Sequence, residues 1–160
     1  MQISRFAARF ALAASCALMV AAPASAQFWQ CVTFARAVSG IQIRGNAHTW
    51  WGQAAGRYAR GQEPRVGAVL AFEATRRMRV GHVAMVSAVV SDREVLLTHA
   101  NWSRRGGVER GARAIDVSPA NDWTQVRVQY GAAMGISVNP AKGFIYATPA
   151  HVPTASNIAE

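Results

Sequence analysis

HVAMVSAVVSDREVLLTHANW, residues 82–102, carries the strongest structural signal in the chain. Two runs rich in valine, alanine and leucine, residues 82–90 and 95–102, flank the polar segment Ser-Asp-Arg-Glu. Runs rich in β-branched residues on either side of a short polar turn are typical of a β-hairpin. The stretch therefore predicts two antiparallel strands that turn at residues 91–94.

Further strands are predicted on both sides of this hairpin. An apolar run over residues 66–72 follows Pro64, and two shorter runs, near residues 114–117 and 124–130, follow a loop rich in glycine and arginine. Short apolar runs separated by glycine, proline and polar residues indicate strands rather than helices. The second half of the chain thus predicts an antiparallel sheet.

The segment before these strands has helical spacing. Residues 31–38 predict a short helix that ends at Ser39-Gly40. A second helix is predicted over residues 47–60, with Asn46 as its N-cap and Gly61 at its end, because large apolar residues recur there at helical intervals. N-terminal helices packed on an antiparallel sheet make an α+β domain.

The first 26 residues are typical of an export signal. Two arginines precede an apolar run over residues 10–22, and Ala24-Ser25-Ala26 fits a cleavage site. The run is too short for a transmembrane anchor. We expect a periplasmic or secreted protein with no stable membrane insertion after the signal at residues 1–26 is removed. The domain would then span residues 27–138, followed by a terminal strand and a flexible tail over residues 139–160.

The chain is strongly basic. Its 17 lysines and arginines exceed 8 acidic residues and give a formal net charge of +9, and loss of Arg5 and Arg9 with the signal leaves 9 − 2 = +7. Such a surface favours an anionic partner. We find no nucleic-acid-binding motif, so we expect no binding to nucleic acid. An anionic membrane or an acidic cell-wall polymer remains as the possible anionic partner. We expect the protein to be a monomer.

Once the signal and its Cys16 are removed, Cys31 is the only cysteine. An exported chain can keep disulfides, but a single cysteine cannot form one within the chain. The residue is an inert buried thiol, an intermolecular bridge or a nucleophile. Its place at the start of a predicted helix favours the nucleophile, because free N–H groups and the helix dipole stabilise a thiolate and lower its pKa. Gln30 offers a further amide donor there, unless it is an ordinary surface side chain.

Three polar residues of the hairpin, His82, His99 and Asn101, are predicted to share one face of the sheet. Pairing Val90 with Val95 places His82 opposite Ser103, with Asn101 on the diagonal. Shifts of two or four residues place Asn101 or His99 opposite His82 and keep all three on that face. The group is either a histidine with an orienting partner or part of a solvated face.

Five short motifs occur in order along the chain: QCVTFAR (30–36), AHTWW (47–51), PRVGAVLAF (64–72), GHVAMV (81–86) and THANW (98–102). This ordered set resembles the CHAP family, the cysteine- and histidine-dependent amidohydrolases/peptidases, which is related to the NlpC-type peptidases. The resemblance implies a papain-like α+β fold and an enzyme that cleaves amide bonds of peptidoglycan. It leaves open which amide bond is cut.

The resemblance also implies roles for individual residues. Cys31 matches the family's nucleophile and His82 its base. Many members have Glu-x-Asn in the third motif, whereas this chain has His99-Ala100-Asn101. NlpC-type relatives use a histidine as their third residue. We therefore predict His99 as the residue that orients His82, with Asn101 in support, although the turn register favours Asn101.

We expect Gln30, Trp29 and Trp50 to contact substrate, and Trp102 to pack under the sheet. We expect no cofactor and no metal; some family members bind calcium through an acidic loop near the cysteine, and this chain has none there. The alternative is an inactive or zinc-binding cell-wall binding module that uses Cys31, His82 and His99, although paired metal-ligand spacings are absent from the sequence.

Overall fold

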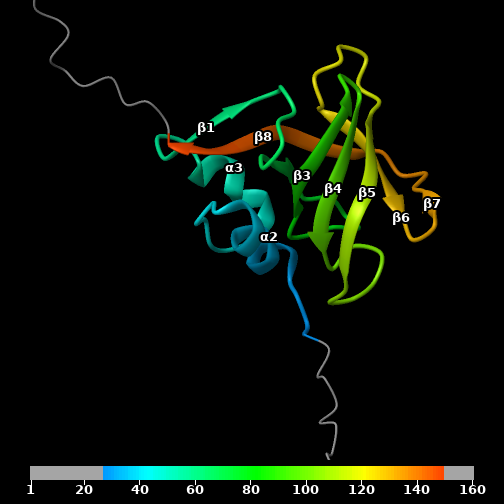
Figure 1. The fold of residues 1–160 in the computed structure, drawn as a ribbon, viewed down its shortest axis with the longest axis horizontal. Helices are drawn as coiled ribbons and strands as arrows, with labels where there is room; N and C mark the ends of the chain where they lie inside the picture. Colours follow the sequence, from blue (N-terminus) through cyan, green and yellow to red (C-terminus); the bar gives the residue numbers. More distant parts are fainter. Residues whose placement is uncertain (1–26, 150–160) are drawn as a thin grey trace, which may run out of the picture.

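The computed structural model describes residues 27–149. The predicted export signal, the lone Cys16 within it, and the tail from residue 150 onward lie outside the described residues. The described chain begins with helices α2 (Cys31–Ser39), η1 (Ala47–Thr49) and α3 (Trp50–Gln53). Figure 1 shows these helices on one side of a strongly curved sheet.

Eight strands follow the helices: β1 (Tyr58–Gly61), β2 (Val69–Phe72), β3 (His82–Ser91), β4 (Glu94–Ala100), β5 (Val108–Asp116), β6 (Gln125–Tyr130), β7 (Ala133–Met134) and β8 (Asn139–Pro149). Their order in the sheet is β1-β8-β2-β3-β4-β5-β6-β7, and all pairings are antiparallel. An additional pairing of β8 with β6 closes the six strands β2 to β6 and β8 into a barrel. The predicted α+β class, helices on an antiparallel sheet, is confirmed.

The strand expected near the C-terminus is β8. It lies between β1 and β2, and its first residues also pair with β6. In Figure 1 it runs across the molecule above the helices. Residues 139–149 therefore belong to the same sheet as the hairpin.

The apolar residues form two cores, on opposite faces of strands β2 and β3. Leu70, Phe72 and Ala84 point into the barrel. Val69 and Val83 point to the other face, where they pack against the helices. Because side chains alternate along a strand, β2 is buried on both faces, and its unbroken apolar run reflects this position.

The predicted helix over residues 47–60 is wrong beyond its first turns. The chain forms only η1 and the four residues of α3, then turns at Gly56, which has a φ of 71°. Gly52 and Gly56 weaken helix propensity, and pairing with β8 draws residues 58–61 into strand β1. Asn46 is the N-cap residue, but its side chain makes no capping bond.

The predicted hairpin forms, with a register that changes along its length. Ser91 pairs with Glu94 at the turn, whereas Val86 pairs with Leu97 nearer the other end. Two irregularities between these pairs shift the strands by two residues in total. The shift preserves the predicted common face, because an even shift leaves the alternation of side chains unchanged.

Candidate active site

Cys31 is the first residue of α2, with Gln30 as the N-cap. Its side chain is 8% exposed and packs in the core between helices and sheet. Burial raises the pKa of the Cys31 thiol, and hydrogen bonds from the backbone at Val83, Val32 and Cys31 itself lower it only in part. The expectation of a lowered thiol pKa is therefore wrong. The helix start supplies donors as predicted, but desolvation outweighs them.

His82 opens strand β3 and is held there by its neighbour Gly81. Gly81 has a φ of 71°, and a Cβ at this position would lie 2.7 Å from the backbone nitrogen of His48 and 2.8 Å from the carbonyl oxygen of Phe72. Only glycine fits such a close approach of two chain segments. The imidazole of His82 is 3% exposed, 4.8 Å from the ring of Trp102 between centroids. Burial lowers its pKa well below the ordinary value, with a further contribution from His99.

His99 lies against His82. Its Nδ1 is 3.0 Å from His82 Nε2, a hydrogen bond between two buried rings. His99 is 1% exposed, and burial lowers its pKa to about 4, although Glu109 raises it in part. Its other nitrogen, Nε2, is buried and has no hydrogen-bond partner among the described residues. Both histidines are thus neutral at neutral pH.

Asn101 does not face His82. It directly follows β4 with a left-handed φ of 61°, and its Oδ1 accepts the backbone N–H of Gly106 at 2.8 Å. Its Nδ2 therefore faces the other way and donates to Gln30 Oε1 at 3.1 Å. This bond engages the oxygen of the Gln30 amide, and its Nε2 makes no hydrogen bond among the described residues, so it remains available as a donor. Of the two candidates, the structure brings His99 and not Asn101 to His82.

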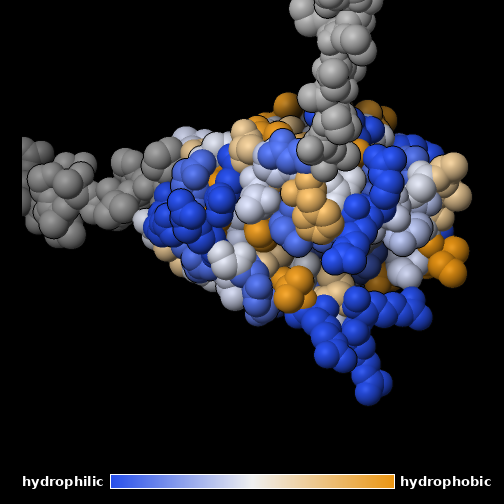
Figure 2. All heavy atoms as spheres, turned by 90° about the horizontal axis from the view of Figure 1, so that it is seen from below, coloured by the Kyte–Doolittle hydropathy of each residue, from blue (hydrophilic) through white to orange (hydrophobic). Residues whose placement is uncertain are grey.

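Cys31 and His82 share a cleft of about 990 Å³. Gln30, Asn101 and Trp102 also line this cleft, as do residues 75–78 and 134–139. The start of α2 and the β4–β5 connection lie at the lower end of the molecule in Figure 1, and Figure 2 looks onto that end. Figure 2 shows a mainly hydrophilic surface there, with long hydrophilic side chains that project from it.

The tryptophans are placed differently from what the sequence predicts. Trp50 is 0% exposed in the core under the helices, so its predicted contact with substrate is wrong. Trp29 is half-buried and packs edge-on against Phe34, 5.5 Å away between ring centroids. Trp102 lines the cleft beside His82 instead of lying only beneath the sheet, and its Nε1 donates to the carbonyl of Gln129 at 2.9 Å.

Within residues 27–149, no group of three or more histidine, cysteine, aspartate or glutamate side chains is arranged to hold a metal ion. In the same part of the chain, no helix has the length and apolar character needed to span a bilayer.

The sequence profile of the CHAP domain matches residues 22–101, half of the 160-residue chain. The chain belongs to the CHAP family. It is therefore an amidohydrolase of the cysteine- and histidine-dependent type, and its helices on an antiparallel barrel agree with a CHAP domain. No curated protein matches the chain.

Proposed function

We propose that this CHAP protein is an exported hydrolase that cuts an amide bond of peptidoglycan, with Cys31 as the nucleophile and His82 as the base. The observation that carries the proposal is the pairing of His82 Nε2 with the buried Nδ1 of His99 in the cleft that Cys31 also lines. A base needs a partner that fixes its orientation and tautomer, and this bond supplies one.

The state of the two histidines follows from their hydrogen bond. One proton lies between His82 Nε2 and His99 Nδ1, and either nitrogen can carry it. If His82 carries it, Nδ1 of the same ring is unprotonated and can accept the thiol proton. His99 then keeps its single proton on Nε2. This tautomer pair is the one that the proposed reaction requires.

Cys31 and His82 start the reaction as an uncharged pair. Burial raises the thiol pKa and lowers the pKa of His82, so that a thiol and a neutral imidazole are the stable forms at neutral pH. His82 thus acts as a general base: it takes the thiol proton as Sγ attacks the carbonyl carbon. The imidazolium gives this proton to the leaving amine, and water activated by His82 then hydrolyses the thioester.

Donors at the start of α2 support the oxyanion that forms in this attack. The backbone N–H groups of the first helical turn lack partners within the helix, and the N–H of Cys31 lies next to the attacking sulfur. The Gln30 amide adds Nε2, which Asn101 frees by holding Oε1. In this proposal Asn101 positions Gln30, whereas His99 positions His82.

The cleft also fits an anionic substrate. Its lining includes Arg76 and Arg77 and, among the described residues, neither aspartate nor glutamate. Arg77 Nη1 donates to Ser137 Oγ at 3.2 Å, which places its guanidinium beside another residue that lines the cleft. Carboxylate groups of a peptide stem are suitable partners for such guanidinium groups.

Digestion of purified peptidoglycan by the protein tests this function. We expect soluble fragments whose new termini, identified by mass spectrometry, are either a free sugar lactyl group with a free N-terminal amine, or a peptide carboxylate with a free amine. The first result identifies an amidase and the second an endopeptidase. Intact peptidoglycan after prolonged digestion with folded protein would refute the proposal.

A further inference from the structure

Glu109 lies directly opposite His99 in the sheet. The two residues are Cα partners in the pairing of β4 with β5. Side chains of directly paired residues project from the same face, with Cβ atoms roughly 5 Å apart. Glu109 is half-buried, and its Oε1 accepts the backbone N–H of Ser103 at 2.8 Å, so the carboxylate has a fixed position.

A bulge in β5 is what brings the carboxylate to this position. Leu97 pairs with Ala112, so an unbroken register would place Arg110 opposite His99. The register shifts between these pairs and places Glu109 there instead. Gly111, with a left-handed φ of 68°, lies within the bulged segment. A left-handed glycine is typical of one common type of β-bulge. The irregularity thus exchanges a cation for an anion beside the histidine pair.

One ring nitrogen of His99 lacks a hydrogen-bond partner within the described part of the chain, and the negative charge of Glu109 can stabilise a proton on it. This nitrogen, Nε2, is buried without a hydrogen-bond partner among the described residues. Catalysis as proposed above needs the proton of neutral His99 on that nitrogen. No hydrogen bond joins Glu109 to His99, so the carboxylate acts through space, and its charge favours a proton on the ring. Groups that face His99 are His82 from β3 and Glu109 from β5.

We propose that Glu109 is a positioning residue whose charge, aimed by the β5 bulge, holds the proton of His99 on Nε2 and thereby leaves His82 Nδ1 free for the Cys31 proton. The inference rests on the proposed function of the Cys31–His82 pair. It extends the chain of contacts from Cys31 through His82 and His99 to a fourth residue.

Glu109→Gln tests the proposal, because the amide oxygen can still accept the Ser103 N–H while the charge is lost. We expect kcat/KM on peptidoglycan fragments to fall roughly tenfold, the order for one charge acting over a few ångströms in a half-buried site. The acidic limb of the pH profile should move to lower pH, since loss of a nearby negative charge makes the histidine pair less basic. Glu109→Asp should restore part of the activity.

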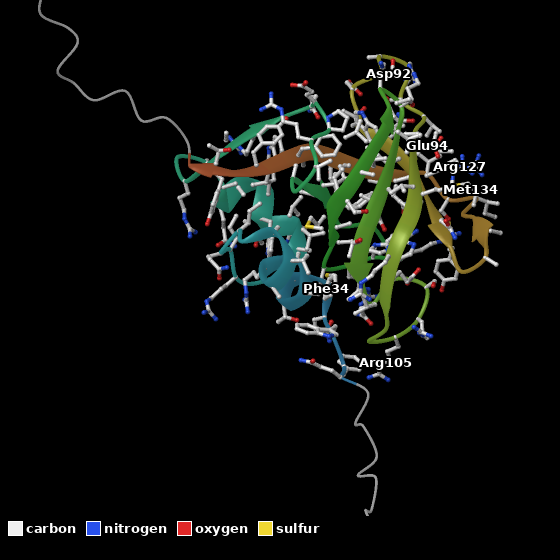
Figure 3. The ribbon with its side chains drawn as sticks, in the orientation of Figure 1. Phe34, Asp92, Glu94, Arg105, Arg127 and Met134 are labelled. Carbon is white, nitrogen blue, oxygen red and sulfur yellow. The ribbon has the colours of Figure 1, made fainter. Side chains whose placement is uncertain are left out.

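Glu94→Gln is the matched control. Glu94 belongs to β4 but lies at the opposite end of the hairpin, where Figure 3 shows it near Asp92 and far from Arg105. The Glu94→Gln change should leave both kcat/KM and the acidic limb of the pH profile unchanged. Wild-type kcat/KM together with an unshifted acidic limb in Glu109→Gln would overturn the inference while leaving the role of Cys31 intact.

Nitrogen-15 NMR of the imidazoles gives a readout that needs no activity and no change at Glu109. In Cys31→Ala protein, we expect the His99 proton on Nε2 and the His82 proton on Nε2. A His99 proton on Nδ1 overturns the proposal even if Glu109→Gln fails to fold. If Cys31 variants instead keep their activity, the proposed function itself is contradicted. The failure of the inference and the failure of the proposed function are therefore distinguishable.

Discussion

The buried histidine pair makes the stability of the fold depend on pH. An unfolded histidine has a pKa near 6.5, whereas burial lowers the pKa of His99 to about 4. The unfolded chain therefore binds this proton first, and stability is lost as pH falls from about 6.5 towards 4. A difference of about 2.5 units at 1.36 kcal/mol each corresponds to a loss on the order of 3 kcal/mol from His99 alone. His82 is shifted in the same direction and adds to the loss.

His99→Gln isolates this contribution, because glutamine can accept the bond from His82 but does not titrate. Urea unfolding followed by tryptophan fluorescence should be measured from pH 7.5 to pH 4. The free energy of unfolding of the wild type should fall by about 3 kcal/mol more than that of His99→Gln over this range. Carboxylates titrate in both proteins and cancel in the difference. His48→Gln, a change at an exposed histidine, is the control and should follow the wild type. Parallel curves for wild type and His99→Gln would show that the ring is not held neutral by burial.

Three further predictions concern the cleft. His99→Ala should lower kcat, measured by fragment release, at least a hundredfold with folding intact, and Asn101→Ala should lower it less. His99→Glu should keep part of the activity. A larger loss of activity in Asn101→Ala than in His99→Ala would contradict the assignment of His99. Gly81→Ala should destabilise the fold by about 2 kcal/mol or more, since its Cβ would meet two backbone segments, and thermal unfolding measures this. Activity on intact peptidoglycan should fall less steeply with rising salt when Arg76 and Arg77 are both changed to glutamine, while cleavage of a small neutral peptide stays little affected. Equal salt dependence in the wild type and the double variant would mean that these arginines do not contact the substrate.

Local sequence patterns were enough to predict the strands of the hairpin and the first helix. The β-branched runs over residues 82–90 and 95–102 indicate β3 and β4 because strand propensity and turn chemistry agree there. Gly40, left-handed at the end of α2, closes the helix where the sequence predicts. In both places the information lies within a few residues of the element.

Contacts between distant segments explain what the sequence did not reveal. Residues 58–61 have helical spacing, but they pair with β8, some 85 residues further along the chain. Trp50 is predicted to contact substrate, yet it fills the core under the helices. The bulge that selects Glu109 over Arg110 depends on how β5 pairs with β4, which no pattern within β5 shows.

The candidate site was predicted in its residue types more than in its electrostatics. The common face of His82 and His99 follows from strand alternation alone. The sign of the Cys31 pKa shift does not, because it depends on how deeply α2 is buried against β3. The partner of Asn101 depends on its left-handed backbone, which turns its amide from His82 towards Gln30.

The lytic activity of Cys31→Ala tests the central claim most directly. The thiol is small and mainly contacts the core between helix and sheet, so alanine should leave the fold intact, as circular dichroism and thermal unfolding will show. Release of soluble fragments from purified peptidoglycan should then fall to the level without enzyme. Wild-type release by folded Cys31→Ala would contradict the assignment of Cys31 as the nucleophile.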